Sequence, residues 1–301
     1  MLTIDPKNTP TAELHQYMLG AVAPRPIAFV STISGDGIPN LAPYSFFNAY
    51  SSRPPVLVFS SNRRVRDNTT KDTLSNVEDT REVVINIVNY DMVYQMALAS
   101  VEYGREIDEF AKSGLTPIAS DIVKPFRVKE SPVQIECIVQ RVIPLGNAGG
   151  AGNLIICEIV RMHISQHILD EKGHISPYKT DQMARMGKNY YCRVVPQSIM
   201  SIHQPVEKMG MGVDALPDDI RLSSVLTGND LARLAAEIAL PSTENIAQLA
   251  QIDTQLSQLL TAPKSNEQQT AIHQYAQKLI AQNQIEQAWI ALLAQPNSKK
   301  H

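Results

Sequence analysis

Cysteine is scarce in this sequence of 301 residues, which contains only Cys137, Cys157 and Cys192. Their number is odd and no two of them form a C-x-x-C pair, so neither a disulfide framework nor a structural zinc site is expected, and a reducing cytoplasm is the expected compartment. The first residues lack a basic segment followed by an apolar one, so no secretory signal is predicted. No apolar run approaches the roughly 18 residues of a membrane-spanning helix, so no membrane partner is expected.

An excess of positive charge is also absent. The sequence has 27 Lys and Arg against 30 Asp and Glu, a net charge of −3, and no basic run longer than the pair Arg63 and Arg64. A nucleic-acid partner is therefore not indicated. The charges are uneven along the chain, because residues 200–301 hold 7 basic and 10 acidic residues, whereas residues 1–199 are balanced. The whole net charge thus falls in the last third.

Short segments rich in β-branched residues and separated by turn residues dominate residues 26–164. Residues 26–33 end in the turn signal Ser34–Gly37 and continue into residues 38–43, which predicts a β-hairpin. Consecutive strands with few helices between them favour an antiparallel, closed or half-closed sheet over a parallel α/β sheet. Further strands are predicted over residues 56–60, 82–88, 133–143 and 154–164, with short helices over 71–80 and 92–100.

From about residue 200 the apolar residues recur at spacings of three and four. Capping residues at Thr227, Ser242 and Ser265 each precede such a pattern, and a fourth pattern starts at Ile285. We predict an all-α appendage of four amphipathic helices, the second of which runs to Leu259. The appendage contains no cluster of titratable residues, so packing or oligomer contact is favoured over a role as a lid on an active site.

Three motifs that could suggest other chemistry have simpler explanations. The segment Gly146–Gly152 lies between two predicted strands, whereas a dinucleotide-binding loop leads from a strand into a helix, so we interpret it as a hairpin loop. His163 and His167 lie four residues apart, and on the extended strand predicted there they are about 13 Å apart, too far to share a metal ion. Cys137 lies in an apolar strand, as a core residue does. We predict no metal site and no catalytic side chain.

A polar stretch rich in loop residues is the strongest candidate site. Residues 42–55 combine aromatic rings, Ser hydroxyls and Asn amides with backbone stiffened by proline, which suits a planar heteroaromatic ring. Lys71, Asp72 and Thr73 open a predicted helix, where free N–H groups and the helix dipole attract phosphate and the lysine adds a full charge. Each segment alone is also compatible with ordinary turn chemistry. Together they indicate a ring site and a phosphate site.

Several segments also carry a family resemblance, which covers about residues 10–195 in order. These segments resemble the flavin reductase-like family of FMN-binding split barrels, which includes the flavoredoxins. They are Ala23–Thr32, Asn40–Pro55, Lys71–Asn86, Glu109–Pro117, Glu130–Cys137 and Arg185–Tyr191. The resemblance implies a mainly β fold, an antiparallel FMN-binding split β-barrel with short helices over residues 1–199, followed by the helical extension over residues 200–301.

The resemblance also implies a homodimer with FMN near the subunit interface, and it assigns residues to the parts of that cofactor. Ser51, Lys71, Asp72 and Thr73 would lie toward the phosphate, with Asp72 capping the helix or orienting Lys71. Arg185 and Tyr190 belong to an R-x-G-x-x-Y-Y element and would reach the flavin edge. The isoalloxazine and ribityl portions would be lined by Arg25, Ser31, Thr32, Ser45, Phe46, Phe47, Asn48 and Ala49.

The activity implied by this resemblance is an FMN-dependent oxidoreductase. It would accept hydride from NADH or NADPH and pass electrons to a flavin or to a partner protein, and the flavin itself would carry the hydride chemistry. Two alternatives stay open: a non-catalytic, flavoredoxin-like electron carrier, and a barrel that serves as a scaffold while the helical tail recruits a partner. The sequence does not choose between NADH and NADPH.

Overall fold

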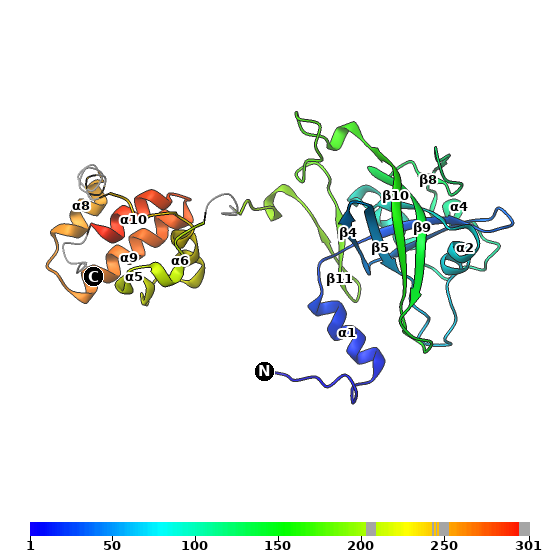
Figure 1. Ribbon diagram of the computed structural model, residues 1–301, viewed down its shortest axis with the longest axis horizontal. Coiled ribbons are helices and arrows are strands. Elements are labelled where there is room, and N and C mark those ends of the chain that lie inside the picture. The colour runs from blue at the N-terminus through cyan, green and yellow to red at the C-terminus, as the bar shows by residue number, and fades with distance from the viewer. Residues whose placement is uncertain (203–208, 243, 245, 247–252, 295–301) are drawn as a thin grey trace. The chain divides into compact units, whose positions relative to one another are not determined.

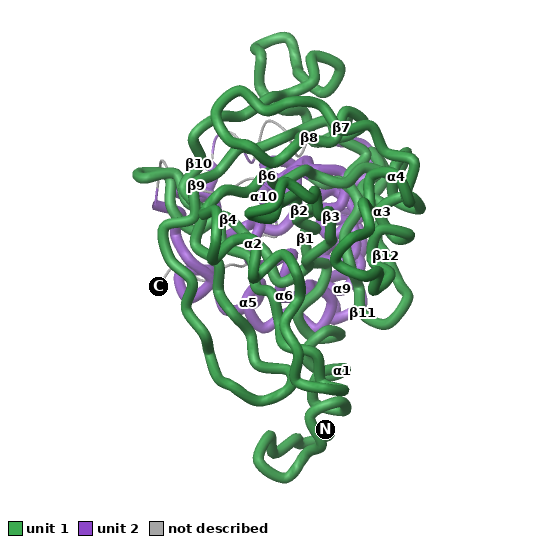
Figure 2. Tube along the Cα trace, turned by 90° about the vertical axis from the view of Figure 1, so that its right-hand side faces the viewer, with its two compact units in different colours: residues 1–200 green, residues 201–301 purple. Residues whose placement is uncertain are grey.

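The computed structural model describes residues 1–202, 209–242, 244, 246 and 253–294. The chain divides into two compact units, residues 1–200 (unit 1) and residues 201–301 (unit 2), which are coloured separately in Figure 2. Each unit has its own core of buried apolar side chains. Within the described residues, no helix is both long and apolar enough to cross a membrane.

Unit 1 is built on a seven-stranded antiparallel sheet with the strand order β3-β2-β6-β9-β10-β5-β4 (Figure 1). The two outermost strands, β3 and β4, follow each other in the sequence and are joined only by Ser45 and Phe46. Such a short link between opposite edges requires the sheet to curl until the edges approach, which gives a split barrel. The strands are β2 (Ala28–Ile33), β3 (Pro39–Tyr44), β4 (Phe47–Ser52), β5 (Pro55–Ser60), β6 (Glu82–Ile87), β9 (Val133–Pro144) and β10 (Asn153–Ile164).

The alternation of side chains along β2 divides the core of unit 1 into two clusters. Val30 belongs to the larger cluster, which also contains Phe59 and Ile85 and is covered by α2 (Asp72–Thr80). Phe29 faces the other side of the strand and joins a second cluster with α3 (Val93–Leu98) and α4 (Glu109–Ser113). Adjacent residues of a strand point to opposite faces of a sheet, so β2 serves both clusters.

Smaller elements surround this sheet. A three-stranded sheet pairs β1 (Arg25–Pro26) and β12 (Tyr190–Arg193) with the central strand β11 (Met183–Gly187), which α1 (Thr11–Ala21) contacts. The short strands β7 (Pro117–Ile118) and β8 (Arg127–Val128) form a separate pair. The 3-10 helices of unit 1 are η1 (Tyr90–Met92), η2 (Gln166–Ile168) and η3 (Pro196–Ser198).

Unit 2 is helical, and its core is built around Trp289, the only tryptophan of the sequence. The indole N–H of Trp289 donates to the carbonyl of Leu234 at 3.2 Å, so the polar atom of this buried ring is satisfied. The ring therefore packs without an unmet polar group. The described elements are η4 (Val213–Ala215), α5 (Asp218–Arg221), α6 (Gly228–Ala235), α8 (Thr254–Thr261), α9 (Asn266–Ala281) and α10 (Ile285–Leu293).

The structure confirms the predicted architecture of antiparallel strands, short helices and a helical C-terminal part. It corrects the second helix of the tail, because Asp253 is a non-helical N-cap whose carboxylate accepts from the Leu256 N–H at 2.9 Å, and α8 begins after it. Before Asp253, the described residues Glu244 and Ile246 are helical, and the Ile246 N–H donates to the carbonyl of Ser242 at 3.0 Å. Residues 243, 245 and 247–252, over which the predicted helix would run, lie outside the described residues.

Two predictions in unit 1 are also corrected, and one helix was not predicted. Residues 47–52 form strand β4 and not a loop, because they pair with β5. The strand predicted over residues 154–164 does end at Ile164, where its partner strand β9 begins directly after Pro132, but the strand-like pattern read on to His167 is wrong, since His167 lies in η2. Helix α1 was not predicted, because it buries no residue and so lacks the periodic apolar signal that marks a packed helix.

Candidate functional site

A network of polar side chains fixes the first turn of α2 against strands β2 and β3. Thr32 on β2 and Asn40 on β3 are register partners. The amide of Asn40 donates to the hydroxyls of Thr32 and Thr73, at 3.2 Å and 2.9 Å. The amide of Asn76, one turn further along α2, donates to Thr32 at 3.1 Å. Three strongly buried side chains, Thr32, Thr73 and Asn76, therefore hold the helix start in place.

Within the described residues, two buried hydroxyl groups beside this network form no hydrogen bond of standard length and angle. They belong to Tyr44, which is 5% exposed, and Ser61, which is 1% exposed. Burial raises the pKa of Tyr44 to about 12, although the nearby hydroxyls of Thr73 and Ser61 act in the opposite direction. A buried polar group without a partner costs about 1–3 kcal/mol, so these hydroxyls are ready to bind an oxygen-rich ligand.

Lys71 occupies the N-cap position of α2, and its ammonium lies 5.0 Å from the centre of the Tyr44 ring. Partial burial, together with the charge of Arg64, lowers the pKa of Lys71. In the described part of the chain no carboxylate forms an ion pair with Lys71. A cation at the positive end of a helix dipole, next to unpaired hydroxyls, attracts an anion such as phosphate. The chain's own residues therefore fit a phosphate group here.

Asp72 does not have the role expected from the sequence. Lys71 takes the N-cap position, and Asp72 is the first residue of α2, where its side chain makes no capping hydrogen bond. Among the described ion pairs, none joins Asp72 to Lys71. The negative charge of Asp72 is instead favourable in the first turn because it lies near the positive end of the helix dipole.

The segment predicted to line a ring lies mostly on an exposed edge strand. Phe47 is half-buried and packs on the larger core cluster, whereas residues 48–52 of β4 are exposed. β4 pairs with β5 on one side, and among the described residues no strand pairs with its other backbone edge. The side chains of Asn48 and Ser51 make only local bonds, to the N–H groups of Ala49 and Arg53. These residues of β4 present a surface rather than enclose a pocket.

A second group of predicted residues meets at a cavity of about 240 Å³. Arg25 and Arg185 are register partners on β1 and β11, and the guanidinium of Arg25 lies 3.5 Å from the hydroxyl of Ser45. Burial and the charge of Arg185 lower the pKa of Arg25. The guanidinium of Arg185 donates to the hydroxyl of Tyr191 at 2.6 Å, whereas Tyr190 is 70% exposed. The cavity is lined by Ile27, Pro43, Tyr44, Ser45, Met96, Ser100, Arg185 and Tyr191.

The structure does not bring all of the predicted residues together. Ser31 pairs with Leu41, a member of the cluster beneath α3 and α4, so its side chain lies on the opposite face of β2 from Thr32. Phe46 lies in the link between β3 and β4, the two edge strands of the barrel. Its carbonyl accepts a hydrogen bond from the Ser60 N–H at 2.9 Å, and its ring contacts the ring of His15 edge-on. Tyr191 lines the cavity, and the contact of Tyr190 with the flavin edge stays a prediction.

Sequence reasoning assigned no role to Asn40, Ser61, Arg64 or Asn76, and it included Tyr44 only as one aromatic ring of residues 42–55. One signal was available for Asn76, which follows Thr73 by three residues and therefore shares its face of the helix. The others belong to strands and loops that meet α2 only in the folded chain.

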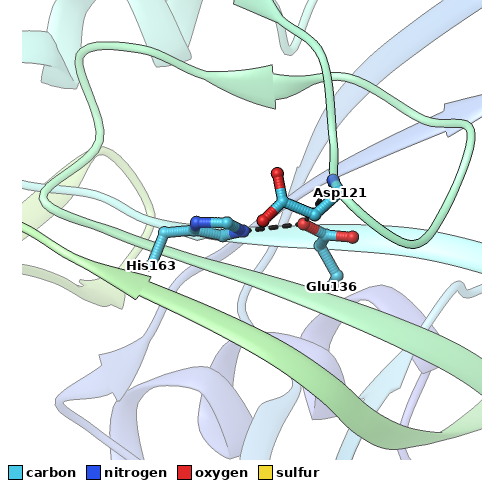
Figure 3. Close-up of side chains that lie close together, drawn as sticks. All are labelled: Asp121, Glu136 and His163. Carbon is cyan, nitrogen blue, oxygen red and sulfur yellow. Dashed lines mark hydrogen bonds and ion pairs between the residues drawn. The ribbon is translucent and has the colours of Figure 1, made fainter.

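A separate polar cluster joins His163 on β10, Glu136 on β9 and Asp121 (Figure 3). The carboxylate of Glu136 is fully buried and accepts hydrogen bonds from His163 and from the backbone N–H groups of Asp121, Ile122 and Val123, at 2.7–3.1 Å. Burial alone would raise the pKa of Glu136, but these bonds outweigh it and lower the pKa to about 2. Because its oxygens are occupied, Glu136 holds residues 121–123 on the sheet, and the cluster serves structure.

The curled antiparallel sheet and the anion-attracting start of α2 together define the class, a split-barrel protein of the flavoprotein type. The model of the family described as "Flavin reductase like domain" matches residues 19–185, and the chain belongs to this family. The match lies within unit 1. An uncharacterized protein of Aquifex aeolicus is 41% identical over 187 residues, which cover 62% of this chain and 93% of that protein.

Solved structures agree with this assignment. Component B of nitrilotriacetate monooxygenase from Bacillus cereus is 28% identical, with a TM-score of 0.62, over 68% of this chain and 98% of that chain. The 2-nitrobenzoate 2-nitroreductase of Pseudomonas fluorescens is 25% identical, with a TM-score of 0.60, over 67% and 96% of the two chains. The flavoredoxin of Desulfovibrio vulgaris, at 21% identity and a TM-score of 0.51 over 60% and 91%, shares the fold.

Proposed function

We propose that unit 1 binds FMN and acts in the cytoplasm as an oxidoreductase that accepts hydride from NADH or NADPH and passes electrons to a flavin or a partner protein. The observation that carries this proposal is the start of α2. There, among the described residues, a half-buried lysine forms no ion pair with a carboxylate and lies beside the buried hydroxyls of Tyr44 and Ser61, which form no hydrogen bond of standard geometry. The names of the two similar enzymes, a monooxygenase component and a nitroreductase, support redox chemistry.

The residues of this chain would bind and orient the cofactor. Lys71 and the first N–H groups of α2 would neutralise the phosphate, while Tyr44 and Ser61 would donate hydrogen bonds to it. Arg25 and Arg185 put positive charge beside a cavity where a ligand that takes up electrons gains negative charge. When bound, FMN would supply hydride and one-electron chemistry, so no catalytic side chain is required.

We also propose that the active form is a homodimer. Two features of unit 1 support a second copy as the partner: the free backbone edge of β4, and the exposed side chains of Val160, Met162 and Ile164 on the part of β10 that extends past β5. An unpaired edge and an exposed apolar row are typical of surfaces that another chain covers. Sedimentation of the full-length protein should give twice the mass of one chain, and a monomer at micromolar concentration would contradict the proposal.

The redox function is tested with the full-length protein and FMN. We expect tight binding, and then bleaching of the visible flavin band when NADH or NADPH is added without oxygen. If FMN binds and neither nucleotide bleaches it, the protein is an electron carrier and not a reductase. A protein that stays colourless with added FMN would rule out both functions.

The phosphate role of Lys71 has its own test. Lys71→Ala should weaken FMN about tenfold or more, because a charge-assisted hydrogen bond is lost, and should leave the affinity for riboflavin nearly unchanged. Titration with each flavin measures both dissociation constants. Lys112→Ala is a matched control, since the Lys112 ammonium also lies over a tyrosine ring, 5.9 Å from the centre of Tyr103. Equal losses for FMN and riboflavin would refute the phosphate role.

A further inference from the structure

A second cavity in unit 1 has a volume of about 640 Å³. Of the described residues that line it, none also lines the cavity beside Arg185. Its volume lies within the range of about 300–1,000 Å³ that is typical of small-molecule sites. The walls come from the segment after β6, from the connection between β8 and β9, from the end of β10 with η2, and from residues 179–181.

The strand pairing places this cavity at the end of the barrel opposite the start of α2. β6 runs antiparallel to β2, so that Ile87, at the end of β6, pairs with Ala28, at the start of β2. Asn89 follows β6 closely and lines the cavity. Thr32, which holds the start of α2, lies near the other end of β2. Within one chain, the cavity is therefore separate from the residues proposed to bind the phosphate of FMN.

Hydrogen bonds fix the walls of this cavity. The side-chain oxygen of Gln134, buried on β9, accepts from the guanidinium of Arg127 at 2.9 Å, and its amide nitrogen donates to two backbone carbonyls at 2.9 Å and 3.0 Å. The buried carboxylate of Glu136 holds the ring of His163 at 2.7 Å, as Figure 3 shows. The ammonium of Lys179 donates to a backbone carbonyl at 2.6 Å. Walls that are fixed in advance lower the entropic cost of binding a ligand.

Two acceptor side chains of the cavity are left without a partner by the fold. The side-chain oxygen of Asn89 is buried, and within the described part of the chain it forms no hydrogen bond of standard length and angle. Asp91 lies two residues further on, in η1, and no described residue forms an ion pair with it. The carboxylate of Asp181, in contrast, is occupied by Arg193 at 2.7 Å and 2.8 Å. An acceptor oxygen beside a carboxylate suits an ammonium group.

The same cavity has cations without an acidic partner. Lys129 is exposed, and its ammonium makes no ion pair or hydrogen bond to any residue that the structure describes. The bond of Lys179 goes to a neutral carbonyl, so its charge is also not balanced there. Glu130 is next to Lys129, but both its carboxylate oxygens lie 3.1 Å from the backbone N–H of Thr116. A carboxylate on a ligand would supply the missing anion.

We propose that this cavity binds a small zwitterion of the amino-acid type, with a carboxylate, an ammonium and an apolar body. Asn89 and Asp91 bind the ammonium, Lys129 and Lys179 bind the carboxylate, and apolar lining residues such as Ile168 contact the body. The inference goes beyond the proposed redox function and does not depend on FMN.

The test uses the full-length chain and three probes that share one ring. para-Aminomethylbenzoate carries both charges, para-methylbenzoate lacks the ammonium, and benzylamine lacks the carboxylate. Isothermal titration calorimetry with and without FMN measures the dissociation constants. We expect the zwitterion to bind about tenfold more tightly than either of the other probes, because each of these loses one charge-assisted contact. FMN should change the affinity by less than twofold.

Two variants assign the two ends of the zwitterion. Asn89→Ala should weaken the zwitterion about threefold or more and leave para-methylbenzoate within twofold, because only the ammonium contact is lost. If Asn89→Ala does not fold, Asp91→Asn tests the same end at an exposed position. Lys129→Glu should weaken both carboxylate probes about tenfold and benzylamine less than twofold.

Matched controls separate these effects from general changes in charge or stability. Lys172→Glu reverses the charge of another exposed lysine, and Asn147→Ala removes another asparagine side chain; neither residue lines the cavity. Both controls should keep all three affinities within twofold of the wild type. A loss in Lys172→Glu equal to that in Lys129→Glu would show that only the overall charge of the surface matters, and would overturn the inference.

The remaining outcomes distinguish this inference from the proposed function. Ile164 lines the cavity and belongs to the exposed apolar row that the proposed homodimer covers, so a partner copy that fills the cavity would prevent binding. The absence of saturable binding of the zwitterion, or equal affinity for all three probes, would overturn the inference. Loss of binding when FMN is added would place the probe at the flavin and would also overturn it. Bleaching of FMN by NADH or NADPH is measured separately, so either proposal can fail while the other stands.

Discussion

Unit 1 and unit 2 bury very different side chains. Among the described residues, 18 polar or charged side chains are buried, and all except His273 belong to unit 1. All six buried side-chain atoms that lack a hydrogen-bond partner are also in the described part of unit 1. His273, in contrast, is hydrogen-bonded to the hydroxyl of Ser223 at 2.7 Å. Unit 2 is therefore built for packing, whereas unit 1 retains polar groups that cost stability unless a ligand uses them.

The largest test of this contrast removes the central side chain of unit 2. Trp289→Ala should lower the free energy of unfolding of unit 2 by about 3–5 kcal/mol, since a fully buried ring leaves a cavity. Hydrogen exchange resolved by peptide should show loss of protection in α6, α9 and α10, with unchanged protection of the barrel and unchanged FMN affinity. Phe59→Ala in the barrel core should give the opposite distribution. Loss of protection in both units from either change would show that they unfold as one.

An acid titration tests the buried charge of unit 1. Because the pKa of Glu136 in the folded chain is about 2 against an ordinary value of 4.5, its contribution to stability is present above pH 4.5 and is lost as the pH falls toward 2. The loss amounts to roughly 3 kcal/mol. Glu136→Gln should lower the stability of unit 1 at neutral pH and flatten its dependence on pH between 4.5 and 2, as measured by urea unfolding.

The control for this titration is Glu130→Gln. Glu130 is exposed, and both its carboxylate oxygens lie 3.1 Å from the backbone N–H of Thr116. The control should keep the wild-type slope. A slope that Glu136→Gln leaves unchanged would mean that other carboxylates carry the acid sensitivity.

The smallest expected effect compares one tyrosine hydroxyl in each unit. Tyr44→Phe removes a buried hydroxyl that forms no hydrogen bond of standard geometry with the described residues, so the ligand-free protein should be equally stable or about 1 kcal/mol more stable, while FMN affinity falls. Tyr275→Phe in unit 2 removes a hydroxyl that donates to Asp253 at 2.6 Å and should cost about 1 kcal/mol, with no effect on FMN. Thermal unfolding and FMN titration of both variants measure this. Destabilisation of the ligand-free protein by Tyr44→Phe would contradict the view that this buried hydroxyl of unit 1 is satisfied only when a ligand binds.

Local pattern was sufficient to predict most of the framework. The turn Ser34–Gly37, the long strands β9 and β10, and the helix after Lys71 all follow from residues that are neighbours in the sequence. Local pattern failed where a distant partner decides the structure. β4 is a strand only because β5 pairs with it, and the alternation that continues to His167 does not extend β10, because its partner β9 begins only after Pro132. The predicted helix included Asp253, because one capping residue among regularly spaced apolar residues is only a weak signal that a helix is interrupted.

The residues of the candidate site were harder to predict from local pattern than the strands and helices were. Lys71 and Thr73 were recognisable because a charge and a hydroxyl at a helix start suggest an anion. Arg64 was noticed only as half of a basic pair, since its position depends on a loop that lies some 80 residues further along the chain. The R-x-G-x-x-Y-Y element does not show which of its two tyrosines lines the cavity, because neighbouring strand residues face opposite sides of the strand. Tyr191 lines it, and the contact of Tyr190 with the flavin edge stays a prediction.

The strand order of the barrel also has a consequence for biosynthesis. β10 lies between β9 and β5, and it places Cys157 opposite Leu57, about 100 residues earlier in the chain. The ribosome makes the amino-terminal residues first, so the hairpin of β4 and β5 is made well before β10. This hairpin therefore lacks its neighbouring strand until nearly all of unit 1 has been made. Unit 2 follows with contacts between successive helices, such as α9 and α10, that form quickly. The slower unit is thus synthesised first, and it still has to complete its sheet while the faster one emerges.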